Sequence, residues 1–166
     1  IKILLFLRNK GIKDEKVLLS IEKIPPHYFL FLLQKSNTLL QINYEETARL
    51  AKILQEAFIS KKKISNILIT EFNLGWFLII SSFMVKRVYG LCNNKENILN
   101  VERICNILKI PNIFIKKSNN CLDWKKVAPF DMIISLNSFE SFPNQFLKLL
   151  DDDGLIFFAK ENKDKL

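Results

Sequence analysis

The sequence predicts an α/β fold in which a mostly parallel sheet lies between layers of helices. Short segments rich in Ile and Leu, such as Asn66–Thr70, show no polar alternation, which is typical of parallel strands buried on both faces. Through the second half of the chain these segments alternate with segments of helical apolar spacing. The 166 residues contain no repeat and no linker, so one domain over residues 1–166 is expected.

Residues 1–60 predict an N-terminal helical segment. Gly11 is suited to end the first helix and Asp14 to cap the second, because glycine and aspartate favour these two helix ends. The Pro25-Pro26 pair should stop the second helix. The expected elements are a helix over Ile1–Asn9, a helix after Asp14 with Val17, Leu18, Ile21 and Ile24 on its apolar face, a connector over Ser36–Ile42, and an amphipathic helix over Glu45–Phe58.

Residues 61–166 predict the Rossmann-like core, in which strands alternate with helices. At this spacing, right-handed crossovers would make the strands parallel. The expected strands are Asn66–Thr70, Arg87–Leu91, Asn112–Lys116, Asp131–Leu136 and Leu155–Ala159. The expected connections are helices over Trp76–Phe83, Glu96–Leu108 and Pro143–Leu150, a loop over Ser118–Pro129 that carries Trp124, and a turn over Asp151–Gly154.

The composition narrows the class of protein. Hydrophobic residues make up 49% of the chain and charged residues 25%, which is typical of a globular protein rather than a disordered one. Cys92, Cys105 and Cys121 have no metal-ligand spacing, which predicts a reduced compartment, the cytoplasm or an organelle matrix. The longest apolar segment, Trp76–Val85, is too short to span a membrane, so no membrane partner is expected.

The net charge of +8 allows two interpretations. A basic protein can bind nucleic acid, or its lysines can form a solvated surface. The lysine clusters are short and scattered, and no stripe of arginine and aromatic residues accompanies them, which favours the solvated surface. The clusters are Lys61–Lys63, Lys116–Lys117 and Lys125–Lys126.

Motifs for catalysis are scarce. The sequence has no Walker loop, no set of metal ligands and no supported Ser-His-Asp arrangement. His27 lies beside prolines and aromatic residues, and we interpret it as a packed or hydrogen-bonded structural residue rather than a base. Glu45-Glu46 is typical of a helix N-terminus, and Asp151–Asp153 is typical of a solvated cap rather than a cation site.

The segment from Lys63 to Trp76 has the frame of a nucleotide site. A strand, a loop and a helix in this order place backbone N–H groups at a helix N-terminus, where anionic groups bind. Such a loop is normally rich in glycine, yet this one contains only Gly75. The frame is therefore present, whereas most of the expected loop chemistry is missing.

Several stretches between Leu7 and Phe158 resemble the protein-L-isoaspartate O-methyltransferase family of class I, S-adenosylmethionine-dependent methyltransferases. They are Leu7–Leu18, with its Gly-Ile step and Val-Leu helix, Ile24–Phe29, similar to Val-Pro-Arg-His-x-Phe, and Ala128–Ile134, similar to Ala-Pro-Phe-Asp-x-Ile-Ile, preceded by Trp124. The resemblance implies a Rossmann-like fold and an S-adenosylmethionine cofactor. It also implies an antiparallel pair of strands beyond the fifth strand; the sequence given ends at Leu166, soon after the fifth strand, so this pair is either absent or lies outside the residues given.

The departures from the family fall on its functional positions. The positions that match its cofactor site are Glu71, Asn73 and Gly75 for three loop glycines, Cys92 for the acidic residue that holds the ribose, and Asn119 for the aspartate near the adenine. Glu46 or Thr47 matches the serine of the substrate segment. Glu71 would repel the methionine carboxylate, and the thiol of Cys92 is a weak hydrogen-bonding group. Phe72 and Leu74 could fill the space left by the cofactor.

Two functions are consistent with this sequence. The first is a degenerate, non-catalytic methyltransferase-like domain, a pseudoenzyme that acts as a binding or structural subunit with protein or RNA in a larger assembly. The alternative is an active enzyme that uses S-adenosylmethionine to methylate isoaspartyl carboxylates in damaged proteins. Methyl transfer depends mainly on orientation and proximity, so the absence of a base does not exclude the second function. No metal is expected in either case.

Overall fold

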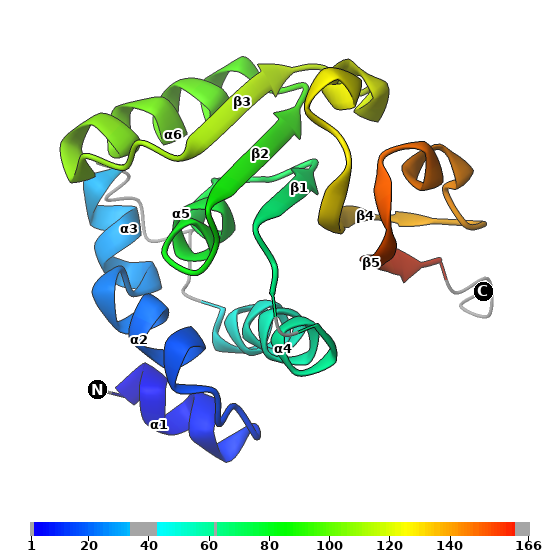
Figure 1. Ribbon diagram of the computed structural model, residues 1–166. Helices are drawn as coiled ribbons and strands as arrows, with labels where there is room; N and C mark the ends of the chain where they lie inside the picture. The colour runs from blue at the N-terminus through cyan, green and yellow to red at the C-terminus, as the bar shows by residue number, and fades with distance from the viewer. Residues whose placement is uncertain (1, 34–42, 62, 162–166) are drawn as a thin grey trace, which may run out of the picture.

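The computed structural model describes residues 2–33, 43–61 and 63–161, and its centre is a five-stranded sheet (Figure 1). The strands are β1 (Asn66–Thr70), β2 (Arg87–Cys92), β3 (Ile113–Lys117), β4 (Phe130–Phe139) and β5 (Leu150–Lys160). Their order is β3-β2-β1-β4-β5, and each neighbouring pair is parallel. The predicted α/β fold with a parallel sheet is confirmed, and the predicted bounds of the first strand match those of β1.

The helices begin and end at residues suited to those positions. Asp14 caps the second helix by accepting hydrogen bonds from the N–H groups of Lys16 and Val17. Gly11, with φ +90°, follows the first helix, and Ile12 N–H donates to Leu7 O across it, as in a Schellman motif. The α-helices are α1 (Lys2–Asn9), α2 (Glu15–Lys23), α3 (Pro26–Leu32), α4 (Tyr44–Ser60), α5 (Trp76–Ser82) and α6 (Lys95–Leu108).

The Pro25-Pro26 pair starts a helix as well as ending one. The second helix stops at Lys23, as predicted, but Pro26 then occupies the first turn of α3, where the missing N–H of proline costs nothing. His27 is exposed on this short helix, so the interpretation of His27 as a packed residue is wrong. The predicted connector over Ser36–Ile42 lies outside the described residues.

The two faces of the sheet are covered differently. Along β1, Ile67 and Ile69 belong to one hydrophobic cluster and Leu68 to another, as expected from alternating side chains on a strand. The first cluster is large and includes residues of all six α-helices. The second is smaller and is covered by two short 3₁₀ helices, η1 (Cys121–Val127) and η2 (Asn144–Lys148).

The connection between β4 and β5 differs from the prediction. The expected helix over Pro143–Leu150 is only the single 3₁₀ segment η2, and the expected turn at Asp151–Gly154 is part of β5. β5 already pairs with β4 at Leu150, opposite Phe130, and the next partners are Met132 and Leu155. The acidic residues therefore form an irregularity within the strand, because β5 contains more residues than β4 between these two pairs.

Lys61, just after α4, joins three strands at their amino ends. Its Nζ lies 2.7 Å from Asp153 Oδ1 and 3.3 Å from Asp131 Oδ1. Asp131 also accepts hydrogen bonds from the backbone N–H groups of Ser65 and Asn66, at 2.8 and 3.0 Å. This arrangement fixes the entry into β1 against β4 and β5, on the side of the sheet opposite the carboxyl ends of the strands.

Candidate functional site

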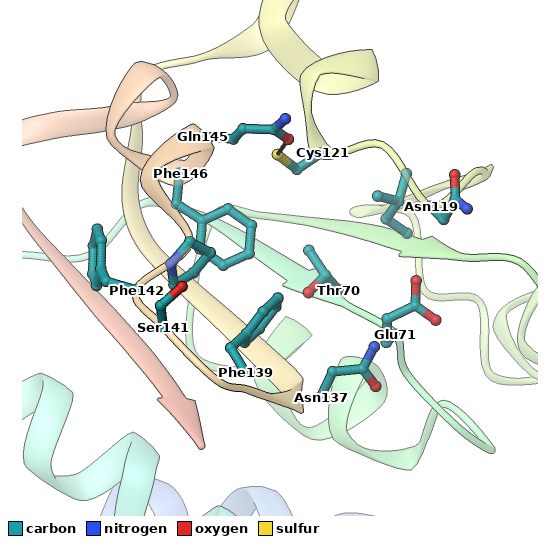
Figure 2. Close-up of a pocket in the computed structure, with 12 residues that line it drawn as sticks. Thr70, Glu71, Asn119, Cys121, Asn137, Phe139, Ser141, Phe142, Gln145 and Phe146 are labelled. Carbon is teal, nitrogen blue, oxygen red and sulfur yellow. Dashed lines mark hydrogen bonds between the residues drawn. The ribbon is translucent and has the colours of Figure 1, made fainter. Parts of the chain in front are cut away.

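A pocket of about 400 Å³ opens at the carboxyl ends of β1 and β4 (Figure 2). These neighbouring strands lie where the order of the sheet reverses, and ligands of open α/β sheets bind at such a point. Below it, Thr70 Oγ1 donates to Ser135 Oγ at 2.9 Å, joining the two strand ends. The lining residues are Thr70, Glu71, Leu91, Asn119, Cys121, Asn137, Phe139, Ser141, Phe142, Pro143, Gln145 and Phe146.

Glu71 brings a carboxylate to this pocket immediately after β1. Its φ of +53° is in the left-handed region that glycine favours, and its N–H donates to Leu91 O at 2.6 Å. Among the described residues, no hydrogen-bond or ion-pair partner contacts its carboxylate. Burial raises the pKa of Glu71, because desolvation penalises the charged form.

The rest of the loop after β1 does not fill the pocket. Phe72 is buried against the sheet, and a Cβ built on Gly90 would lie 3.0 Å from Phe72 Cε1. Leu74 packs against the main hydrophobic cluster, and Asn73 is exposed. Of this loop, only Glu71 lines the pocket, so Phe72 and Leu74 do not narrow the space that remains.

Gly75 has a packing reason to be glycine. Its φ is +88°, and it precedes the first residue of α5. A Cβ at this position would lie 2.0 Å from Val101 Cγ2, on the neighbouring helix α6. The glycine therefore permits a close approach between the loop and α6.

Cys92, at the end of β2, is buried and does not line the pocket. Its Sγ accepts a hydrogen bond from Asn94 N at 3.4 Å and donates to Asn94 O at 3.5 Å. Burial raises the pKa of the Cys92 thiol, and the negative charge of Glu71 acts in the same direction. A neutral thiol that is already hydrogen-bonded to the backbone of Asn94 offers little to a ribose hydroxyl.

The remaining predicted site residues separate into two groups. Asn119 is exposed and lines the pocket. Glu46 and Thr47 are part of α4 and do not line the pocket. The carboxylate of Glu46 accepts two hydrogen bonds from the guanidinium of Arg49, at 2.6 and 2.8 Å. Thr47 is buried, and its hydroxyl donates to Asn43 O at 3.1 Å. The hydrogen bond from Arg49 lowers the pKa of Glu46, so the structure provides an internal role for this carboxylate.

Sequence reasoning missed the aromatic wall of the pocket. Phe139, Phe142 and Phe146 come from the end of β4 and the segment that follows it. The rings of Phe139 and Phe146 are 6.1 Å apart at 85°, an edge-to-face contact. A signal was present, since three phenylalanines fall within eight residues of a segment that we had assigned partly to a helix.

These residues do not fit S-adenosylmethionine as the resemblance would place it. The ribose would meet a buried thiol at Cys92, and the methionine carboxylate would meet the carboxylate of Glu71.

Over the described ranges, no three His, Cys, Asp or Glu residues gather as metal ligands. No helix in that part of the chain is long and apolar enough to cross a membrane.

Comparison with known proteins gives related sequences and a shared fold. No family model matches the chain. A protein-L-isoaspartate O-methyltransferase from Dictyoglomus turgidum is 28% identical over 165 residues, which cover 95% of this chain and 74% of the relative. One from Aliivibrio fischeri is 29% identical over 155 residues, which cover 90% of this chain and 74% of the relative.

A crystal structure supports the same comparison at the level of the fold. A Plasmodium falciparum protein assigned as a protein-L-isoaspartate O-methyltransferase, in complex with S-adenosyl-L-homocysteine, superposes with a TM-score of 0.73. The match covers 98% of this chain and 84% of the other, at 18% sequence identity. At this low identity, the superposition supports a shared fold and no more. That fold is the Rossmann-like architecture, with five parallel strands and N-terminal helices.

Proposed function

This chain belongs to the protein-L-isoaspartate O-methyltransferase family, and we propose that it is a member that has lost S-adenosylmethionine binding and serves as a binding or structural subunit. The apolar residues that build the sheet and its helices remain. The residues that would contact the cofactor have changed. Loss of one class of residues without the other is expected where the fold is still needed and the chemistry is not.

The carboxylate of Glu71 is the observation that carries this proposal. It lies at the position that matches the first glycine of the family's cofactor loop, lines the pocket, and has no partner among the described residues. A carboxylate ligand placed beside it would bring two like charges together in a partly desolvated site, which is unfavourable. Its side chain also occupies space that glycine would leave open to the ligand.

Cys92 supports the same conclusion independently. The family's acidic residue would accept two hydrogen bonds from the ribose hydroxyls, whereas the thiol of Cys92 is buried, neutral and bonded to Asn94. Hydrogen bonds to a charged group contribute about 1.5–3 kcal/mol each. The substitution therefore removes roughly two to four decades of affinity for the cofactor.

The alternative function, an active isoaspartyl methyltransferase, is favoured by one observation. The backbone at Glu71 retains the left-handed conformation that suits a glycine, and a pocket remains beside it. Since methyl transfer relies on orientation and proximity, a cofactor that bound in this frame could still react.

An assay of methyl transfer separates the two functions. The purified protein is incubated with S-adenosylmethionine labelled in the methyl group and a peptide that contains one isoaspartyl residue. We expect no labelled ester above the level without protein, under conditions in which the Dictyoglomus turgidum relative serves as the positive control. Labelled ester on the isoaspartyl peptide, absent from the matched aspartyl peptide, would establish the alternative.

A further inference from the structure

The pocket described above is negatively charged in a positively charged protein. The chain has a net charge of +8, but Glu71 is the one charged side chain among the described residues that line the pocket, and no lysine, arginine or histidine joins it there. An anionic ligand would meet only this carboxylate. The charge of the pocket therefore selects for cations, in contrast to the net charge of the chain.

The carboxylate of Glu71 is left without compensation. No described residue donates a hydrogen bond to it or pairs with it, although the carboxylates of Glu15, Glu46 and Asp131 each have a basic partner. A partly buried carboxylate without a partner costs free energy, and a bound cation would recover this cost. Burial also raises the pKa of Glu71, in agreement with that deficit.

The two ends of the pocket differ in chemistry (Figure 2). The side chains of Glu71, Asn119 and Asn137 lie at one end, and those of Phe142 and Phe146 lie toward the other, with Phe139 between them. The first end offers a carboxylate and two amide oxygens, which can accept hydrogen bonds from one ammonium group. The second end offers aromatic faces and edges to an apolar body.

We propose that this pocket binds an organic cation, a primary ammonium carried on a short aromatic or aliphatic body. The ammonium group would lie against Glu71 between the two amides, and the body would lie against the phenylalanines. A volume of about 400 Å³ is within the usual range for small-molecule pockets. The proposal rests on the proposed function, because the same pocket adjoins the positions from which S-adenosylmethionine contacts have been lost.

The test compares three probes that share a phenylethyl body by calorimetric titration at pH 7. They are 2-phenylethylamine, the neutral 2-phenylethanol and the anionic 3-phenylpropionate. We expect the amine to bind at least tenfold more tightly than the alcohol and the propionate to bind most weakly. Equal affinity for the amine and the alcohol, or no measurable binding of the amine, would overturn the proposal.

Two variants separate recognition of the charge from general effects. Glu71→Gln keeps the shape of the side chain and should weaken binding of the amine at least tenfold while leaving the alcohol unchanged. Asp152→Asn removes the same charge from an exposed position of β5 outside the pocket and should leave the amine unchanged. Equal losses in both variants would mean that the attraction comes from net charge alone, which contradicts a site at Glu71.

The aromatic end has its own variant, and the cofactor has its own titration. Phe142→Ala should weaken binding of the amine and of the alcohol by similar factors, with the folded state checked by thermal unfolding.

Titration of S-adenosylmethionine in the same series keeps the two proposals apart. Failure of the amine alone overturns only the cation site, whereas micromolar binding of S-adenosylmethionine overturns the proposed function.

Discussion

At the scale of single residues, two positions in the loop after β1 share a left-handed backbone but differ in what surrounds them. Glu71 and Gly75 both have positive φ, at +53° and +88°. At Glu71 the hydrogen bond from its N–H to Leu91 O holds the conformation, which a residue other than glycine adopts at a cost of about 1–2 kcal/mol. At Gly75 the contact with Val101 forbids any side chain. Gly75 is thus the position in this loop at which packing requires a glycine.

This difference predicts the effect of adding a methyl group at Gly75. We expect Gly75→Ala to lower the free energy of unfolding by about 2–4 kcal/mol, because it combines a strained backbone with overpacking against α6. Gly11→Ala is the matched control, since its φ is +90° but nothing lies within 4 Å of the new Cβ. Urea unfolding measures both, and equal losses at the two positions would contradict a packing role for Gly75.

At the scale of elements, the joint around Lys61 holds α4, β1, β4 and β5 together. Although burial alone would raise the pKa of Asp131, the N–H groups of Asn66 and Ser65 and the ammonium of Lys61 hold it below its usual value. A carboxyl whose pKa is lower in the folded state stabilises the fold above its unfolded pKa, and this stabilisation is lost as the pH falls through the folded value.

The joint predicts how stability depends on acid. Asp131→Asn should lower the free energy of unfolding at pH 7 by about 1–3 kcal/mol, because two backbone N–H groups lose a charged acceptor. The variant should also lose less stability than the parent as the pH falls from about 4 downward. Urea titrations at pH 7 and pH 3 measure both effects, and an unchanged acid dependence would contradict the assignment.

Most elements could be predicted because their patterns are local. β1 is a continuous apolar run, and Asp14 and Gly11 set helix ends through hydrogen bonds to their near neighbours. The segment before β5 could not be predicted. Phe146 and Leu149 are buried three residues apart, and this spacing is compatible both with a 3₁₀ helix and with one turn of an α-helix. Which of the two forms depends on pairing with the distant β4.

At the scale of the whole molecule, the fold could be predicted from sequence and the pocket only in part. The alternation of strands and helices predicts parallel strands joined by right-handed crossovers. The pocket depends on which side chains the ends of β1 and β4 and the segments near η1 and η2 bring together. Glu71 and Asn119 were found because a family resemblance marked their positions, whereas Phe139, Phe142 and Phe146 carried no such mark.

The distribution of charge predicts weak binding of RNA. Lys117, Lys125 and Lys126 are exposed near the end of β3 and along η1. Lys116 is also exposed, but its ammonium donates to Asp123 O and lies over the Trp124 ring. Lys61 is engaged with Asp131 and Asp153. Contact with three or four phosphates would make the affinity fall roughly 20- to 50-fold between 50 and 200 mM salt. Fluorescence anisotropy with a labelled single-stranded RNA measures this slope. Tight binding to one RNA sequence that salt does not weaken would contradict a surface of scattered lysines.

The most direct test of the proposed loss of cofactor binding is a calorimetric titration of the protein with S-adenosylmethionine and with S-adenosyl-L-homocysteine. The same titration is repeated on the triple variant Glu71→Gly, Asn73→Gly and Cys92→Glu, which restores the residue types of the family at these positions. We expect dissociation constants above about 1 mM for the parent and measurable binding only in the triple variant. A micromolar dissociation constant for either compound with the parent would contradict the loss of cofactor binding and favour an active methyltransferase.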